Sequence, residues 1–238
     1  ALGAAIAIVG GSFFGGLPEW FGPYLLSACA FLGGLGVTAL VYRLGRRNGQ
    51  TNVATMLLAG IALTALAGSA VGLFTYLADD ATLRTLTFWN LGSLNGASYA
   101  RLWPLLIISA GVALWLPRRA KALNALLLGE SEAGHLGIDV ERLKRELVFC
   151  TALGVGAAVA AAGMIGFVGL VVPHLVRLLA GPDHRVLLPA SVLAGASLLL
   201  LADLVARLAL APAELPIGIV TAFIGAPFFL YLLLRGRA

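Results

Sequence analysis

Hydrophobic residues run along this chain in long, nearly uninterrupted segments that are separated by short polar stretches. A bilayer-spanning helix needs about 20 predominantly apolar residues, and most of these segments approach or reach that length. Eight segments can be placed, and they are Leu2–Leu17, Tyr24–Tyr42, Val53–Ala78, Leu102–Leu116, Leu147–Ala162, Met164–Ala180, Val186–Leu210 and Ile217–Leu234. The pattern therefore predicts an all-α fold, a polytopic transmembrane helical bundle.

Composition supports a membrane protein. Hydrophobic residues make up 60% of the chain and charged residues 11%, whereas charged residues make up about 25% of a soluble domain. The basic residues stand in short clusters between apolar segments, which is typical of membrane orientation and not of nucleic-acid binding. Both cysteines, Cys29 and Cys150, lie inside apolar segments, which argues against a structural disulfide.

The basic residues also predict an orientation. With eight alternating spans, thirteen of the sixteen Lys and Arg residues fall on one side, and only Arg84, Arg101 and Arg207 fall on the other. The positive-inside rule makes the first side cytoplasmic, with both chain ends inside and residues 79–101 outside.

The longest polar interruption, Arg118–Glu146, carries a pattern of its own. Apolar residues recur at helical spacing through its middle, and glycines interrupt them at positions 129, 134 and 137. This predicts two short helices that join at a glycine and share an apolar face, which a partner has to cover. Two interpretations stay open: a pair of helices on the lipid headgroups, or a docking surface for a cytosolic protein.

Ionisable residues are scarce inside the spans. Asp203 and Arg207, four residues apart, either neutralise each other on one helical face or leave Arg207 to meet an acidic partner outside. An ion-coupled carrier normally has more such groups near the midplane, so we expect energy to enter through the cytoplasmic surface. The three histidines are not at metal-ligand spacing, and no nucleotide-binding motif is present. If ATP is used, a partner chain binds it.

The outer stretch Asp79–Arg101 is too polar to span. It predicts a short helix, Leu83–Leu91, that carries Phe88 and Trp89. Such a helix serves either as a lip over a transport pathway or as an aromatic anchor at the membrane interface.

Three blocks together carry a resemblance. They are LLLGESEAGHLGI (Leu126–Ile138), GFVGLVVPHLVRL (Gly166–Leu178) and the long run Gly181–Phe229, which contains DHR, LPAS and ELPIGIVTAFIGAP. They closely resemble the permease subunits of bacterial ABC importers for vitamin B12, haem and ferric siderophores, the FecCD-type family. The resemblance covers essentially the whole chain. It implies a type II importer permease of ten spans, of which this chain would be spans three to ten in one domain, 1–238.

The resemblance also implies roles for particular residues. Residues 118–146 would hold the cytoplasmic coupling helices that sit in a cleft of the ATP-binding subunit, through Leu128, Gly129, Glu130, Ala133, Leu136, Gly137 and Ile138. Asn52, Val53 and Ala54 would form the cytoplasmic gate, although the paired hydroxyls of some relatives are absent here. Phe88 and Trp89 would border the periplasmic mouth, and Arg207 would meet a glutamate of the binding protein.

The implied assembly is a homodimer in the bacterial inner membrane, with two ATP-binding subunits, one periplasmic binding protein and a cytoplasmic C-terminus. The chain would be no enzyme and would bind no cofactor of its own. The string Thr87–Ala97 is most similar to haem-uptake permeases, so haem is the expected substrate. Vitamin B12 and ferric siderophores are the alternatives within the family. An ion-coupled carrier or a channel without an ATPase is the alternative from another class.

Overall fold

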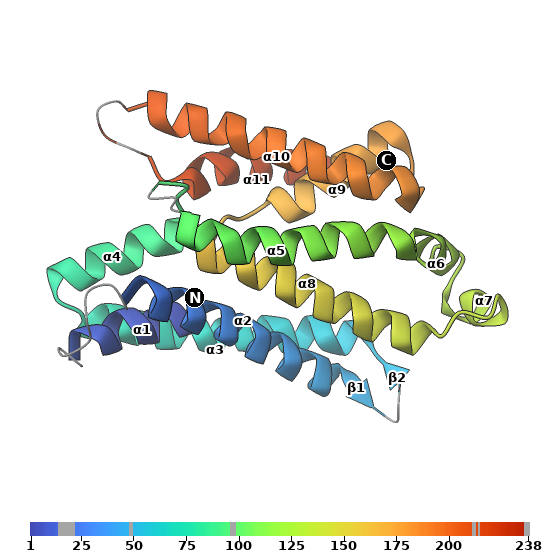
Figure 1. Cartoon of the computed structure of the whole chain (residues 1–238), viewed down its shortest axis with the longest axis horizontal. Helices are drawn as coiled ribbons and strands as arrows, with labels where there is room; N and C mark the ends of the chain where they lie inside the picture. The colour runs from blue at the N-terminus through green and yellow to red at the C-terminus, as the bar shows by residue number, and fades with distance from the viewer. Residues whose placement is uncertain (14–21, 48–49, 96–98, 211–212, 214, 236–238) are drawn as a thin grey trace. The chain divides into compact units, whose positions relative to one another are not determined.

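The structure, a computed structural model, describes residues 1–13, 22–47, 50–95, 99–210, 213 and 215–235 (Figure 1). Its elements in chain order are α1 (Leu2–Phe13), α2 (Gly22–Gly45), β1 (Arg46–Arg47), β2 (Gln50–Thr51), α3 (Val53–Leu77), α4 (Asp80–Leu91), α5 (Tyr99–Trp115), the 3₁₀ turn η1 (Leu116–Arg119), α6 (Ala120–Leu126), α7 (Glu130–His135), α8 (Val140–Ala162), α9 (Val168–Ala180), α10 (His184–Leu208) and α11 (Ile217–Arg235).

The prediction of a helical membrane fold is confirmed. Four helices of the described chain are long and apolar enough to cross a membrane, within α2, α3, α8 and α10, and shorter apolar helices lie within α1, α9 and α11. The only strands among the described residues are the two-residue β1 and β2, which pair antiparallel between the predicted spans Tyr24–Tyr42 and Val53–Ala78.

The two largest differences between predicted and observed helix starts have physical reasons. Helix α8 begins at Val140 and not at Leu147, because charged residues such as Arg142 continue the helix at the surface without changing its backbone. Helix α9 begins at Val168 and not at Met164, because Gly163 and Phe167 both have positive φ, at 72° and 66°. That backbone conformation is incompatible with a continuous right-handed helix.

Four helices begin at an Asn or Asp side chain that caps the first turn. The carboxyl or amide oxygen accepts a backbone N–H at 2.9–3.0 Å, which satisfies a donor that the helix itself leaves unpaired. The capping residues are Asn52 for α3, Asp79 for α4, Asp139 for α8 and Asp183 for α10.

The chain divides into two compact units, and the prediction of a single domain over residues 1–238 remains a prediction. The first unit comprises residues 1–90, 97–109 and 139–163. Within it α2 contacts α1, α3 and α8, and Figure 1 shows α1 and α2 side by side. The helices α1 and α2 approach closely at Gly3, where a Cβ would collide with the backbone of Cys29. Small residues of this kind let membrane helices pack backbone against backbone.

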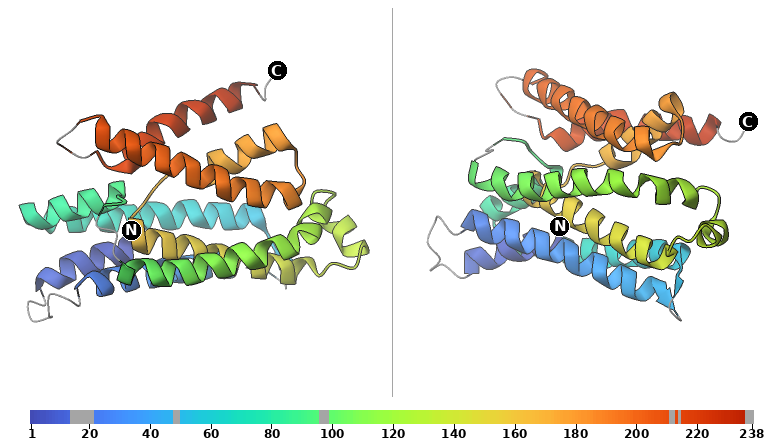
Figure 2. Two further views of the ribbon diagram at one scale, coloured as in Figure 1. Left: turned by 45° about the horizontal axis from the view of Figure 1, so that its top comes forward. Right: turned by 45° about the vertical axis from the view of Figure 1, so that its right-hand side comes forward.

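The second unit comprises residues 91–96, 110–138 and 164–238. Within it α10 contacts α9, α11 and α6, and both views of Figure 2 show α9 and α10 side by side. Its core includes Ala202, Ala206 and Ile217. At Gly218 a Cβ would collide with the carbonyl of Leu91. The start of α11 therefore lies directly against this last residue of α4.

Helix α3 is only partly covered by the rest of the chain, and its half-buried residues include Val71 and Phe74. None of its residues is buried within the chain, although the helix is apolar throughout. In a membrane, lipid or another protein surface covers such a helix.

Candidate functional site

The predicted coupling segment forms two short helices in the second unit, α6 and α7, which contact each other. Gly129 separates them, as the sequence pattern predicted. Its backbone (φ 110°, ψ 157°) lies in a region that is essentially restricted to glycine. A Cβ at this position would meet nothing within 4 Å, so the requirement for glycine is conformational and not steric.

A glycine also ends α7. The N–H of Gly137 donates to Gly134 O and the N–H of Ile138 donates to Ala133 O, at 3.0 and 3.1 Å. With Gly137 at φ 81°, these two bonds make a Schellman motif, which satisfies the last carbonyls of the helix. The spacing of Ala133, Gly137 and Ile138 in the sequence block is therefore explained by one helix terminus.

Part of the exposed surface of this segment is apolar. Leu128 is 67% exposed and Leu136 is 64% exposed, while Leu127 is about half exposed. Ala133 differs from them because it is fully buried, at 0% exposure. The apolar face predicted from the sequence therefore splits into two sets. Leu127, Leu128 and Leu136 are exposed, whereas Ala133 is buried within the segment.

Helix α6 is bound to the start of α10 by polar side chains. The amide of Asn124 donates from Nδ2 to Asp183 Oδ1 at 2.6 Å, and Asn124 Oδ1 accepts the backbone N–H of His184 at 2.8 Å. The ring Nδ1 of His184 lies 2.8 Å from the same oxygen. The backbone N–H of Arg185 and the Asn124 amide hold the pKa of Asp183 below its ordinary value, so the carboxylate stays ionised at neutral pH.

Sequence reasoning missed this connection. Asp183 stands directly before a helical run, which is an N-cap signal that could have been read. Asn124 carries no such signal, because its partners lie about 60 positions further along the chain.

The predicted gate residues lie in the first unit, at the exposed start of α3. Asn52 caps the helix through Thr55 N–H, and Val53 and Ala54 form its first turn. Directly before them, Thr51 is buried at 7% exposure. Its N–H and Oγ1–H donate to Glu141 Oε1 and Oε2 of α8, at 3.0 and 2.6 Å. Sequence reasoning did not identify Thr51, Glu141 or Lys144, whose ammonium donates to Thr51 O at 3.2 Å.

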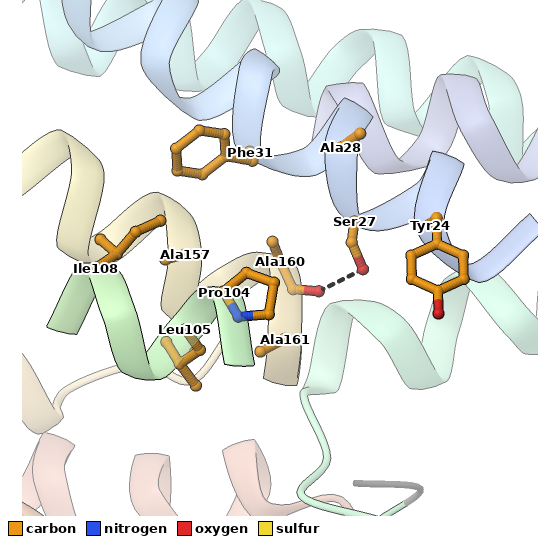
Figure 3. Close-up of a pocket in the computed structure, with 10 residues that line it drawn as sticks. All are labelled: Tyr24, Ser27, Ala28, Phe31, Pro104, Leu105, Ile108, Ala157, Ala160 and Ala161. Atoms are coloured by element: carbon orange, nitrogen blue, oxygen red, sulfur yellow. Dashed lines mark hydrogen bonds between the residues drawn. The ribbon is translucent and has the colours of Figure 1, made fainter. Parts of the chain in front are cut away.

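An apolar cavity of about 300 Å³ lies among α2, α5 and α8 in the first unit (Figure 3). Phe31, Pro104 and Ile108 contribute to its walls, and among the described residues no charged side chain lines it. The hydroxyl of Ser27 donates to the carbonyl of Ala160 at 3.0 Å and is thereby satisfied across two helices. The cavity therefore offers apolar surface and no acid–base or metal chemistry, and none of the predicted site residues lines it.

The helix predicted for the outer mouth is α4, three residues longer at its start than the sequence indicated. Leu86 is buried against Ala5 and Val9, which fixes α4 to α1. Phe88 is 46% exposed, and the Arg84 guanidinium lies 5.7 Å from the centre of its ring. Trp89 is half-buried. Residues 96 and 97 of the string Thr87–Ala97 lie outside the described residues.

Arg207 lies near the end of α10, in the second unit. Its Nε donates to Asp203 Oδ2 at 2.8 Å, and the Arg207 side chain is 49% exposed. The intrahelical pair expected from the spacing is therefore present, and half of the guanidinium side chain still faces outward. Arg207 stands at the opposite end of α10 from Asn124, about 35 Å along the helix from His184 at 1.5 Å per residue.

The profile of the FecCD transport family matches residues 1–235. This chain belongs to the FecCD transport family. Among the family's known members, the hemin transport system permease protein HmuU of Yersinia pestis is 45% identical over 227 residues, which are 93% of this chain and 66% of that protein. The vitamin B12 import system permease protein BtuC of Vibrio cholerae is 45% identical over 236 residues, 99% of this chain and 70% of that protein.

A solved structure gives the same result for the fold. It is described as an inward-facing conformation of a metal-chelate type ABC transporter, and it superposes with a TM-score of 0.85 at 34% identity. The match covers 98% of this chain and 73% of that one. The chain thus spans about two thirds of the length of the hemin permease, and somewhat more of the length of the vitamin B12 permease and of the solved structure.

Proposed function

We propose that this chain is the membrane subunit of an ATP-driven importer that takes haem, or a similar iron chelate, from a periplasmic binding protein into the cytoplasm. The observation that carries the proposal is the α6–α7 segment. It presents Leu127, Leu128 and Leu136 outward on a glycine-defined turn and is bound to α10 through Asn124. A free protein surface rarely exposes neighbouring leucines in this way unless a partner covers them.

The partner that fits this surface is an ATP-binding subunit, one for each of two copies of the permease. Helices α6 and α7, within residues 118–146, form the cytoplasmic coupling helices of a permease domain that comprises both units, 1–238. Among the described residues no group of three or more His, Cys, Asp and Glu side chains is arranged to hold a metal ion. The chemistry of ATP hydrolysis is assigned to the partner, and this chain converts its movement into transport.

Helix α10 supports the proposed orientation of the chain in the membrane. Asn124 contacts the start of this helix, and Arg207 lies near its end, so the coupling helices and Arg207 lie on opposite sides of the membrane that α10 crosses. We place the coupling helices and the C-terminus in the cytoplasm and Arg207 at the periplasmic face of the bacterial inner membrane. The exposed helix α3, with the gate residues Asn52–Ala54 at its start, faces the second copy.

Haem is the proposed substrate, because a hemin permease is 45% identical to this chain. Vitamin B12 is the second candidate, because permeases for it are 43–45% identical over almost the whole chain. The apolar helices contain few charged residues. This composition suits the passage of a bulky ligand that a binding protein delivers. An ion-coupled carrier or channel is the competing class, and it needs no ATPase.

Co-purification tests the class directly. The permease is produced together with an ATP-binding subunit of a FecCD-type importer and extracted in mild detergent. We expect the two to elute as one complex that hydrolyses ATP. If the permease alone accumulates haem or cobalamin in liposomes along an ion gradient, the carrier class is right and the importer is wrong.

Arg207→Glu is expected to weaken docking of the binding protein. The substitution reverses the exposed charge and places a second carboxylate beside Asp203. We expect the Kd to rise by roughly tenfold at low ionic strength, with a smaller difference in high salt. The matched control is Asp203→Asn, which leaves the cation in place and is expected to keep wild-type affinity. If Arg207→Glu also binds like the wild type at low salt, Arg207 serves only to neutralise Asp203.

A further inference from the structure

Three residues connect the start of α8 to the turn before α3, all within the first unit. Glu141 binds Thr51 twice, through the backbone N–H at 3.0 Å and through the hydroxyl at 2.6 Å. Lys144 binds the carbonyl of Thr51 at 3.2 Å and pairs with Glu141 Oε1 at 3.3 Å. Two side chains of α8 thus engage the N–H, the carbonyl and the hydroxyl of one residue.

This cluster is partly shielded from water. Thr51 is 7% exposed, and the side chains of Lys144 and Glu141 are 13% and 31% exposed. Hydrogen bonds to a charged group in such a place are stronger than exposed ones, and a missing partner leaves a buried polar group unsatisfied. We therefore expect the cluster to hold the start of α8 and the turn before α3 together, so that they move as one.

The cluster stands between the two segments that the proposed function requires to move together. On one side, Thr51 directly precedes Asn52, the cap of α3 and the first gate residue. On the other side, α8 begins at Val140, five residues after α7 ends at His135, and Asp139 caps its first turn. A displacement of α7 reaches the first turn of α8 through that short connection.

We propose that Glu141 and Lys144 are positioning residues that bind the gate turn, through Thr51, to the helix that follows the coupling segment. The inference rests on the proposed function, because it assumes that α7 follows the ATP-binding subunit. Movement of α7 then shifts α8, and the Glu141–Thr51 contact carries the start of α3 with it. Without the contact, ATP hydrolysis continues, but the gate residues at the start of α3 no longer move with α7 and α8.

The test compares Thr51→Val, which replaces one hydroxyl by a methyl group, with Thr51→Ser, which keeps the hydroxyl. Each is made in the complete permease–ATPase complex in liposomes with its binding protein. The readout is the amount of haem accumulated per ATP hydrolysed, with cobalamin as the probe if the wild type accumulates that instead. We expect Thr51→Val and Glu141→Ala each to lower this ratio by roughly tenfold, and Thr51→Ser to keep it.

Two further variants separate coupling from folding. The double variant Thr51→Val/Glu141→Ala is expected to be no worse than Glu141→Ala alone, because both remove the same contact. Arg142→Ala, which removes an exposed cation paired with Glu146 on the same helix, is the control and is expected to keep the wild-type ratio. A structural role alone would lower ATP hydrolysis and uptake in proportion and leave the ratio unchanged.

The outcomes distinguish this inference from the proposed function. If the wild type shows ATP-dependent uptake and the ratio is unchanged in Thr51→Val and Glu141→Ala, the inference is wrong and the importer stands. If the wild type shows no ATP-dependent uptake of haem, cobalamin or a ferric siderophore, the proposed function fails and the inference fails with it.

Discussion

Leu136→Arg is expected to abolish ATP-driven uptake while leaving the permease folded in the membrane. Leu136 is 64% exposed in this chain, so the substitution creates no clash within it. In the proposed complex the same position lies in a cleft of the ATP-binding subunit. An unpaired charge buried there costs about 2–5 kcal/mol, which weakens the contact by roughly 30-fold or more. Uptake into liposomes, with ATP hydrolysis measured in the same samples, checks the prediction.

The control is Leu136→Met, which conserves volume and is expected to keep nearly full uptake. Ala133→Arg is unsuitable for this purpose, although Ala133 belongs to the same sequence pattern, because the residue is fully buried and the change disturbs the fold of the segment. ATP-driven uptake by Leu136→Arg at the wild-type rate would show that α7 is not the docking surface.

Gly129→Val is expected to cause the second large loss of ATP-driven uptake. Valine cannot adopt the backbone angles of Gly129 without strain of about 1–3 kcal/mol. Helix α7 has only six residues and cannot hold its direction against that strain. The α6–α7 segment therefore changes conformation, and Leu136 no longer lies in the same exposed position. We expect uptake to fall by at least roughly tenfold.

The matched control lies in the same helix. Gly134 has helical backbone angles, and a Cβ there would meet nothing within 4 Å. Gly134→Ala is therefore expected to keep uptake and to stabilise α7 slightly, since alanine favours helix over glycine by about 1 kcal/mol. Equal uptake by the two variants would show that the turn at Gly129 does not matter for coupling.

Local patterns predicted those parts of the fold that local forces determine. The long apolar runs predicted helices that the structure confirms, and the glycine at position 129 predicted the break between α6 and α7. The spacing of Asp203 and Arg207 predicted their ion pair, because residues four apart share a helical face.

Long-range contacts could not be predicted in this way. Nothing in the periodicity distinguishes Ala133, which is buried, from Leu136, which is exposed. The contact between Thr51 and Glu141 joins residues 90 positions apart, and both read as ordinary polar residues of a cytoplasmic loop. Only the packing of α8 against β2 makes them partners.

The most direct test of the central claim is transport itself. The full permease, with its ATP-binding subunit, is reconstituted in liposomes beside its binding protein, and accumulation of haem, cobalamin and a ferric siderophore is followed with and without ATP. We predict that haem accumulates and that it does so only with ATP. Accumulation of cobalamin or the siderophore instead would keep the importer and discard haem. Accumulation of any of the three without ATP, or of none with the complex intact, would contradict the account.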